Sequence, residues 1–194
     1  MQQELYYVTS NKGKFIEVER YLKRHAPEIV LKQADLDIPE IQSMDQQAVA
    51  QDKAEKARLL LNKPFFIDDA AIYFERWHQF PGVLSKFVSQ GLGIEGLCRL
   101  FEPGDRGYFL LYLVYVAQDG TRCTFEGRCD GSLVLPRTEQ VHPDLPYNLI
   151  FMPDGLDITC AEFWGDPAYD DYLYRIRAVK NFLAWWQGEK HATP

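Results

Sequence analysis

The chain has 194 residues, enough for one large domain or two small lobes, and its 46% hydrophobic content can supply a substantial core. The 28 Asp and Glu residues outnumber the 21 Lys and Arg residues, giving a formal net charge of −7. This charge argues against broad binding to nucleic acids, whose backbone would be repelled. No leader-like segment or apolar run of membrane-spanning length is visible, so we expect a cytoplasmic protein that does not bind membranes.

The first predicted elements form a phosphate-binding turn. An apolar strand at 5–9 precedes a polar turn that contains Thr9 and Asn11, and a helix is expected from Lys14 to His25. A helix N-terminus attracts anions, and Lys14 would add a full positive charge there. Taken alone, such a short motif is more often a solvated loop than a phosphate site.

The pattern of alternating strands and helices then continues. A strand is expected at 29–32, a helix from Met44 to Leu61 that Asp45 caps, and a strand at 65–67. This order is typical of an α/β sheet, in which ligands lie at the carboxyl ends of the strands.

Two adjacent carboxylates, Asp68 and Asp69, follow the strand at 65–67 and are predicted to end it. Carboxylate oxygens at such a strand end can bind a hard cation such as Mg²⁺. Each charged residue also has a simpler interpretation: the two aspartates terminate a strand, Lys53 is a charge on a helix surface, and Glu40 is a loop carboxylate.

The second half of the chain predicts antiparallel strands and a closing helix. The expected elements are a helix near 94–101, a hairpin of strands at 107–116 and 121–129, further strands at 133–135 and 148–152, a helix at 172–187, and a frayed tail at 188–194.

Six motifs follow one another from Val8 to about Leu183. They are Thr9-x-Asn11-x-x-Lys14, Asp37-Ile38-Pro39-Glu40, Ala50-x-x-Lys53-Ala54, Asp68-Asp69 followed by Phe80-Pro81-Gly82, Phe125-x-Gly127-x-x-x-Gly131, and Thr159-x-Ala161-Glu162. In this order and spacing they resemble the inosine triphosphate pyrophosphatase family, also called Ham1-like nucleotide pyrophosphatases. The resemblance implies a single domain over 1–194, with an elongated two-lobed α/β fold, a mixed sheet, flanking helices and a central cleft.

The resemblance also implies an activity: Mg²⁺-dependent hydrolysis of noncanonical purine nucleoside triphosphates, such as those of inosine and xanthosine, to the monophosphate and pyrophosphate. Thr9, Asn11 and Lys14 would then bind the phosphates together with Lys53. Glu40 and Asp69 would bind Mg²⁺ or orient water, with Asp68 beside them, and we favour Asp69 as the base.

A homodimer is implied as well. The consecutive Trp185 and Trp186 point about 100° apart on a helix, so we expect one of the two rings to meet a partner subunit.

The base-binding end departs from the family pattern. Tyr147 keeps the stacking aromatic, but Asn148 stands where the family has Asp, and Arg175 is retained in a Leu-Tyr-Arg segment instead of Ser-His-Arg. We expect Tyr147, Asn148 and Arg175 to contact the base, from the lobe opposite Lys14 and Asp69. Since several polar groups are replaced, the ranking of substrates should change.

Two alternatives remain open. Ala70 and Ala71 replace the Ser or Thr and the Gly that the family has after the acidic pair, which also fits a nucleotide-binding protein with little turnover. A related fold that acts on modified pyrimidine nucleotides, as in Maf-like proteins, is disfavoured by the Thr-x-Asn-x-x-Lys turn and the Phe-Pro-Gly spacing.

Overall fold

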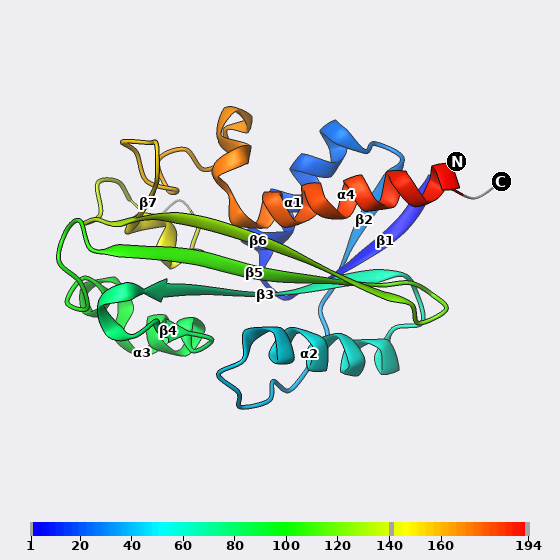
Figure 1. The fold of residues 1–194 in the computed structure, drawn as a ribbon, viewed down its shortest axis with the longest axis horizontal. Helices are drawn as coiled ribbons and strands as arrows, with labels where there is room; N and C mark the ends of the chain where they lie inside the picture. Colours follow the sequence, from blue (N-terminus) through cyan, green and yellow to red (C-terminus); the bar gives the residue numbers. More distant parts are fainter. Residues whose placement is uncertain (1, 140–141, 193–194) are drawn as a thin grey trace.

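The computed structural model describes residues 2–139 and 142–192. An extended mixed sheet runs along the elongated molecule in the order β2-β1-β3-β5-β6-β7, and β4 pairs with β3 (Figure 1). The strands are β1 (Gln3–Val8), β2 (Ile29–Ala34), β3 (Phe65–Phe74), β4 (Phe80–Gly82), β5 (Arg106–Val116), β6 (Arg122–Leu133) and β7 (Phe151–Pro153). β1 is parallel to β2 and β3, and the pairs from β3 to β7 are antiparallel, so the predicted mixed sheet is confirmed.

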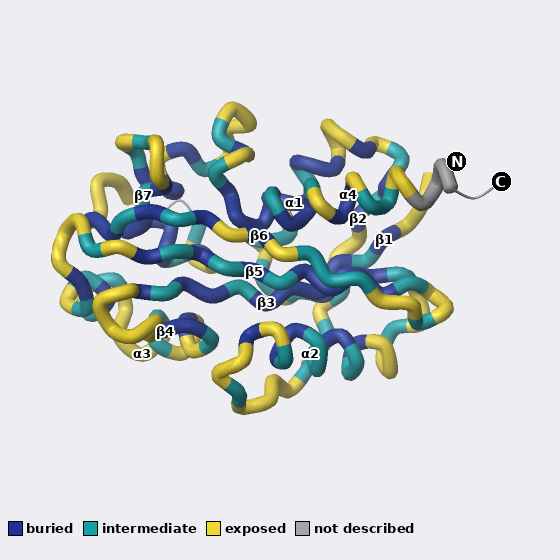
Figure 2. The backbone as a smooth tube through the Cα atoms, in the orientation of Figure 1, coloured by how far each residue is buried: buried dark blue, intermediate teal, exposed yellow. Residues whose placement is uncertain are grey.

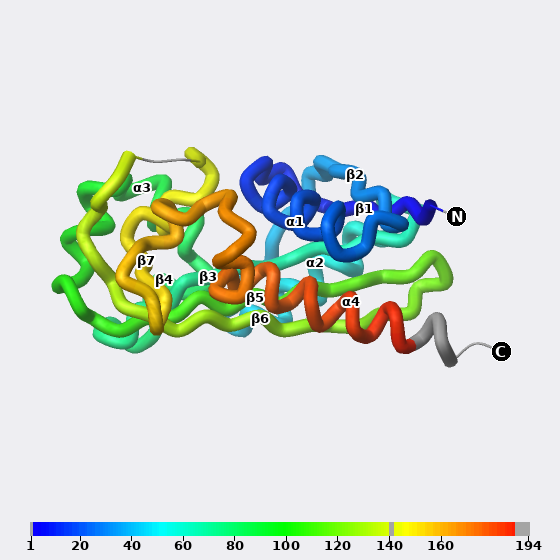
Figure 3. Tube along the Cα trace, turned by 90° about the horizontal axis from the view of Figure 1, so that it is seen from above, coloured from blue at the N-terminus to red at the C-terminus, as the bar shows by residue number. Residues whose placement is uncertain are grey.

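Helices cover both faces of this sheet. They are α1 (Lys12–His25), α2 (Gln46–Leu60), α3 (Ser85–Leu97) and α4 (Tyr174–Ala192), with short 3₁₀ helices η1 (Glu75–Trp77), η2 (Pro146–Leu149) and η3 (Pro167–Tyr172). α1 and α4 lie on one side, while α2 and α3 lie on the other (Figure 1). Seen from above, α4 runs along β5 and β6 (Figure 3).

Most of β3 is buried (Figure 2), and the buried hydrophobic residues of the sheet and its helices form two clusters. The larger cluster joins the sheet to α1 and α4 and includes Phe66 and Phe182, whereas the smaller joins it to α2 and includes Ala54 and Ile67. Successive strand residues point to opposite faces. The alternation of Phe66 and Ile67 therefore continues with Asp68 on the face of α1 and α4 and Asp69 on the face of α2.

The predicted end of the strand at residue 67 is wrong. β3 continues to Phe74, so Asp68 and Asp69 lie within the strand. The parallel pairing with β1 stops at Val8 and Ile67, but the antiparallel pairing with β5 continues to the end of β3. The two aspartates thus lie beyond the last residue of β1, where one side of β3 is free of its neighbour.

Several other boundaries also differ from the predictions. α3 starts at Ser85, earlier than expected; its glycines hide the helical pattern, and the backbone kinks at Gly93, where φ is 61°. β6 runs continuously to Leu133, and the expected strand at 148–152 is η2 followed by the short β7. α4 extends to Ala192, while 193–194 lie outside the described residues, and the expected fraying of the tail stays a prediction.

Both tryptophans of the consecutive pair pack within their own chain. The Trp185 and Trp186 ring centroids lie 5.4 and 5.6 Å from that of Tyr115 on β5. Two rings that diverge around a helix can thus flank one aromatic ring beneath it, and the expected contact of one of them with a partner subunit stays a prediction. Within the described ranges, no helix has the length and apolar character needed to cross a bilayer.

Candidate active site

A pocket of about 820 Å³ collects all ten residues that the sequence nominates as site residues. These are Thr9, Asn11, Lys14, Glu40, Lys53, Asp68, Asp69, Tyr147, Asn148 and Arg175. They come from the turn after β1, the first turn of α1, the loop before α2, α2 itself, the middle of β3, η2 and the start of α4. The pocket opens where β1 ends beside β3, so residues from both sheet faces reach it.

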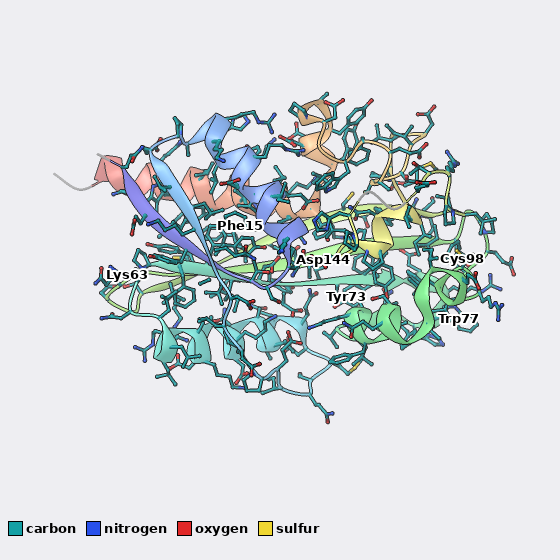
Figure 4. All side chains as sticks on the ribbon, turned by 180° about the vertical axis from the view of Figure 1, so that it is seen from behind. Phe15, Lys63, Tyr73, Trp77, Cys98 and Asp144 are labelled. Carbon is teal, nitrogen blue, oxygen red and sulfur yellow. The ribbon has the colours of Figure 1, made fainter. Side chains whose placement is uncertain are left out.

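The turn after β1 is held by its own side chains. The Asn11 side-chain oxygen accepts a hydrogen bond from the Lys14 backbone N–H at 2.9 Å, which makes Asn11 the N-cap of α1. The Asn11 backbone N–H donates to the Thr9 hydroxyl at 3.1 Å, and its side-chain amide donates to the Asp144 carbonyl at 2.9 Å. Asp144 lies beside the start of α1 in Figure 4. The turn thus presents the positive end of α1 to the pocket.

Lys14 reaches from this turn to β3. Its ammonium nitrogen lies 2.8 Å from one carboxylate oxygen of Asp68. Burial lowers the pKa of Lys14, and the negative charge of Asp68 offsets this only in part. Burial alone would raise the pKa of Asp68, but Lys14 and Arg175 outweigh it and hold that pKa well below its usual range. Asp68 is therefore ionised at neutral pH and paired with the side chains of Lys14 and Arg175.

Asp69 points to the other face, toward α2. The Lys53 ammonium nitrogen lies 3.4 Å from an Asp69 carboxylate oxygen and 2.9 Å from one of Glu40. Burial raises the pKa of Asp69, and Lys53 opposes this only in part. Burial acts in the same direction on Glu40, but the charge of Lys53 prevails and lowers the pKa of Glu40. Two carboxylates with differently shifted pKa values thus converge on one ammonium group.

The backbone at Asp69 has a support that the sequence did not reveal. The Gln46 side-chain amide donates to the carbonyls of Asp69 and Leu110, both at 3.0 Å, and its oxygen accepts from the Tyr73 hydroxyl at 2.9 Å. Gln46 is the first residue of α2 and only 4% exposed. It therefore ties the start of α2 to the part of β3 that carries the acidic pair.

The expected base-binding residues are largely enclosed. Tyr147 is buried, its hydroxyl donates to the Ser85 carbonyl at 2.8 Å, and Asn148 beside it is also buried. Tyr174, which stands where the family has His, stacks on Phe109 with ring centroids 4.4 Å apart. Both tyrosines are thus fixed by contacts within the protein.

Arg175 lies with Lys14 and Asp68, so its predicted place in the opposite lobe is wrong. Its guanidinium is 1% exposed and donates to Asp68, to Glu17 of α1 and to the Tyr174 hydroxyl. The reason is that α4 begins beside α1 on the same sheet face. Glu17 was not singled out from the sequence. It lies on the same buried face of α1 as Tyr21, and a carboxylate on such a face indicates a buried cation as its partner.

Lys86 is a second pocket residue that the sequence reasoning missed. It lies in the first turn of α3, lines the pocket and contributes to the lowered pKa of Glu40. Its position shortly after Phe80-Pro81-Gly82 was the available signal.

The acidic groups fit a magnesium ion that is shared with a substrate. No group of three or more His, Cys, Asp or Glu side chains placed to hold a metal occurs among the residues that the structure describes. Mg²⁺ commonly binds through one or two carboxylates together with substrate phosphates. Glu40 and Asp69, whose oxygens already converge on the Lys53 ammonium, are a donor set of that kind.

Comparison with known proteins gives consistent matches. The model of the Ham1 family matches residues 5–185. A dITP/XTP pyrophosphatase of Thermococcus kodakarensis is 32% identical over 184 residues, 93% of this chain and 96% of the relative. An inosine triphosphate pyrophosphatase of Yarrowia lipolytica is 33% identical over 186 residues, 92% and 94% of the two chains.

Solved structures confirm the predicted fold. The Ham1 protein of Staphylococcus aureus aligns with a TM-score of 0.75 at 22% identity, covering 96% of this chain and all of that one. A HAM1 protein of Coxiella burnetii gives a TM-score of 0.73 at 18% identity, covering 96% of this chain and 100% of that chain.

Proposed function

Because this chain belongs to the Ham1 family, we propose that it is a Mg²⁺-dependent nucleoside triphosphate pyrophosphatase that acts on noncanonical purine nucleotides. The observation that carries the proposal is the convergence of Lys14, Lys53 and Lys86 with Glu40 and Asp69 in one pocket. A polyanionic triphosphate needs several cations around it, and hydrolysis needs a base near them. The names of these relatives, dITP/XTP and inosine triphosphate pyrophosphatases, favour a 6-oxo purine as the base.

The phosphate end of the site is assigned to four residues. Thr9 and Asn11 shape the turn, so that the N-terminus of α1 attracts the phosphate oxygens, and Lys14 and Lys53 neutralise them. Glu40 and Asp69 would hold Mg²⁺, which when bound supplies further charge neutralisation at the phosphates. Lys86 approaches from α3 and adds a third lysine to this end.

The two aspartates take different parts in the reaction. A water oxygen bonds to phosphorus, the bond across the α–β anhydride breaks, and nucleoside monophosphate and pyrophosphate leave. The proton of the water passes to a carboxylate. We assign that role to Asp69, which faces the pocket beside Lys53 and Glu40, whereas both oxygens of Asp68 are engaged by Lys14 and Arg175.

The base end is assigned to the enclosed residues. Tyr147 and Asn148 line the same pocket as the lysines and are the candidates for contact with the base and sugar. Ser89 and Gln90 of α3 line it too and offer polar groups to a base.

The proposal is tested by measuring pyrophosphate release from a panel of ribo- and deoxyribonucleoside triphosphates, with Mg²⁺ and with excess chelator. We expect turnover that requires Mg²⁺ and yields pyrophosphate and monophosphate in equal amounts. Release of phosphate instead would contradict cleavage at the α–β bond. Nucleotide binding without any turnover would favour the alternative of a binding protein, which is motivated by Ala70 and Ala71 in place of the family's Ser or Thr and Gly.

A further inference from the structure

A chain of four charged residues, three of them buried, extends from the pocket into the protein. The two oxygens of Asp68 are divided between two cations: one accepts from the Lys14 ammonium at 2.8 Å, the other from the Arg175 Nε–H at 3.2 Å. Arg175 continues the chain by donating to Glu17 through Nη1. Glu17, Asp68 and Arg175 are each at most 3% exposed.

This division fixes the orientation of Asp68. A carboxylate that meets a single ammonium can rotate about its side-chain bonds, because an ammonium is a point charge without a preferred plane. The planar guanidinium of Arg175 removes that freedom by holding the second oxygen from behind. The first oxygen, and the Lys14 ammonium that it positions, then have a defined place at the pocket wall.

Glu17 completes the chain electrostatically. Lys14 and Arg175 carry two positive charges, and Asp68 alone supplies one negative charge. Glu17 supplies the second, so the buried group is neutral as a whole. Without it, Arg175 would be a buried cation that shares a single carboxylate with Lys14, which is costly in a medium of low dielectric. The Tyr174 hydroxyl accepts from Nη2 of Arg175 at 3.2 Å, so that each of the three guanidinium nitrogens has a partner.

We infer that Arg175 and Glu17 are positioning residues for phosphate binding, which act through Asp68 to aim the Lys14 ammonium at the triphosphate. The inference rests on the proposed function of this pocket. It differs from the role that the family resemblance implies for Arg175, which is contact with the base. The two roles predict different responses to a ligand that has phosphates but no base.

Inorganic tripolyphosphate is that ligand. Its dissociation constant is measured by calorimetry with Mg²⁺ for the wild type, Arg175→Lys and Glu17→Gln. The lysine in Arg175→Lys keeps the positive charge but lacks the planar guanidinium that reaches both Asp68 and Glu17. The glutamine in Glu17→Gln keeps the shape of the side chain without its charge. We expect tripolyphosphate binding to weaken about tenfold in both variants, since a displacement of about 1 Å can cost up to ~100-fold.

Turnover is the second readout. For each variant, kcat/KM is expected to fall by a similar factor for inosine triphosphate and for adenosine triphosphate, because the defect lies at the phosphates that both substrates share. Arg177→Lys and Glu19→Gln are the matched controls on the same two helices. Arg177 donates to backbone carbonyls, Glu19 pairs with Lys23 on the surface, and neither residue lines the pocket.

Unchanged tripolyphosphate affinity in both variants overturns the inference. If the ratio of kcat/KM for inosine triphosphate to kcat/KM for adenosine triphosphate changes at the same time, Arg175 contacts the base instead. A wild type that neither binds tripolyphosphate nor hydrolyses nucleotides overturns the proposed function itself. If the single variants do not fold, the double variant Glu17→Gln with Arg175→Gln removes one charge of each sign and is judged by the same two readouts.

Discussion

Two neighbouring carboxylates on β3 meet different cations because they face opposite sides of the sheet. Asp68 is held by Lys14 and Arg175, so its pKa is depressed against the effect of burial. Asp69 meets Lys53, more distantly, and burial keeps its pKa raised. Neighbours in the sequence therefore have separable roles, and single substitutions can distinguish them.

Replacing the Asp69 carboxylate with an amide should abolish most turnover and leave the fold intact. Asp69→Asn keeps the side-chain volume but removes the base and a magnesium ligand, so kcat should fall by ~10²–10⁴. The measurement is Mg²⁺-dependent pyrophosphate release, with circular dichroism to verify folding. Asp154→Asn is the control, since Asp154 pairs with Arg106 on the surface. Activity within a factor of a few of the wild type would refute the role of Asp69.

Asp68→Asn should instead lower stability, in a way that depends on pH. The substitution leaves Lys14 and Arg175 without their shared carboxylate, at a cost of about 3–5 kcal/mol near neutral pH. Because the folded pKa of Asp68 is depressed, its contribution is present above its unfolded pKa and is lost as the pH falls toward the folded pKa.

The difference in free energy of unfolding between wild type and Asp68→Asn should therefore shrink as the pH is lowered from about 6 toward about 3. Denaturant titrations at several pH values measure it. A difference that stays constant over this range would show that the charge of Asp68 does not stabilise the fold.

Base discrimination should be weaker than the family pattern implies. Asn148, Leu173 and Tyr174 stand where the family has Asp, Ser and His, so donors that favour a 6-oxo purine over adenine are depleted. The values of kcat/KM for inosine, xanthosine, adenosine, guanosine and uridine triphosphates should differ by less than a hundredfold. A hundredfold preference for inosine triphosphate, about 2.7 kcal/mol in transition-state binding, would mean that other residues supply the selectivity.

At the scale of elements, one glycine sets how closely α4 approaches the sheet. A Cβ atom at Gly127 of β6 would lie 1.9 Å from the Tyr174 carbonyl oxygen and 2.8 Å from the Ala178 nitrogen. Both are backbone atoms of α4, which cannot move aside as a side chain can. Close packing against α4 thus explains the glycine at position 127 of the Phe125-x-Gly127-x-x-x-Gly131 motif. The same contact fixes the position of Arg175 at the start of α4.

Gly127→Ala should destabilise the protein by about 1–3 kcal/mol or more, because it forces the helix away from the strand. It should also reduce phosphate binding, since Arg175 would move with α4. Thermal unfolding and tripolyphosphate binding measure the two effects. Gly91→Ala in α3 is the control, because a Cβ there meets nothing within 4 Å. Equal stability of Gly127→Ala and the wild type would contradict this account of the contact.

Local signals were readable in the sequence. Asp45 was predicted to cap its helix and does so, because capping depends on residues within one turn. The length of β3 was not readable, because it is set by pairing with β5, whose partner residues lie far along the chain. Glu17 and Arg175 are 158 positions apart, and no local pattern could join them.

For the whole molecule, the comparisons support the family and the fold but not the assembly. The homodimer that the resemblance implies stays a prediction. Exposed apolar side chains on and beside α3, Leu84, Phe87 and Leu92, are candidates for such an interface, since clustered exposed apolar surface often marks association sites. Sedimentation equilibrium should give twice the 22.5 kDa of one chain. A single-chain mass at micromolar concentrations would contradict the dimer.

The alternation of side chains along β3 also makes this strand sensitive to its length. Inserting or deleting one residue before Asp68 would shift the register by one position, so that each carboxylate would turn to the opposite face of the sheet. Lys14 and Lys53 would then each face the wrong partner, although every catalytic side chain would still be present. A point substitution in β3 changes one side chain at a time. A change in length upstream of the acidic pair instead moves both carboxylates to the opposite faces of the sheet.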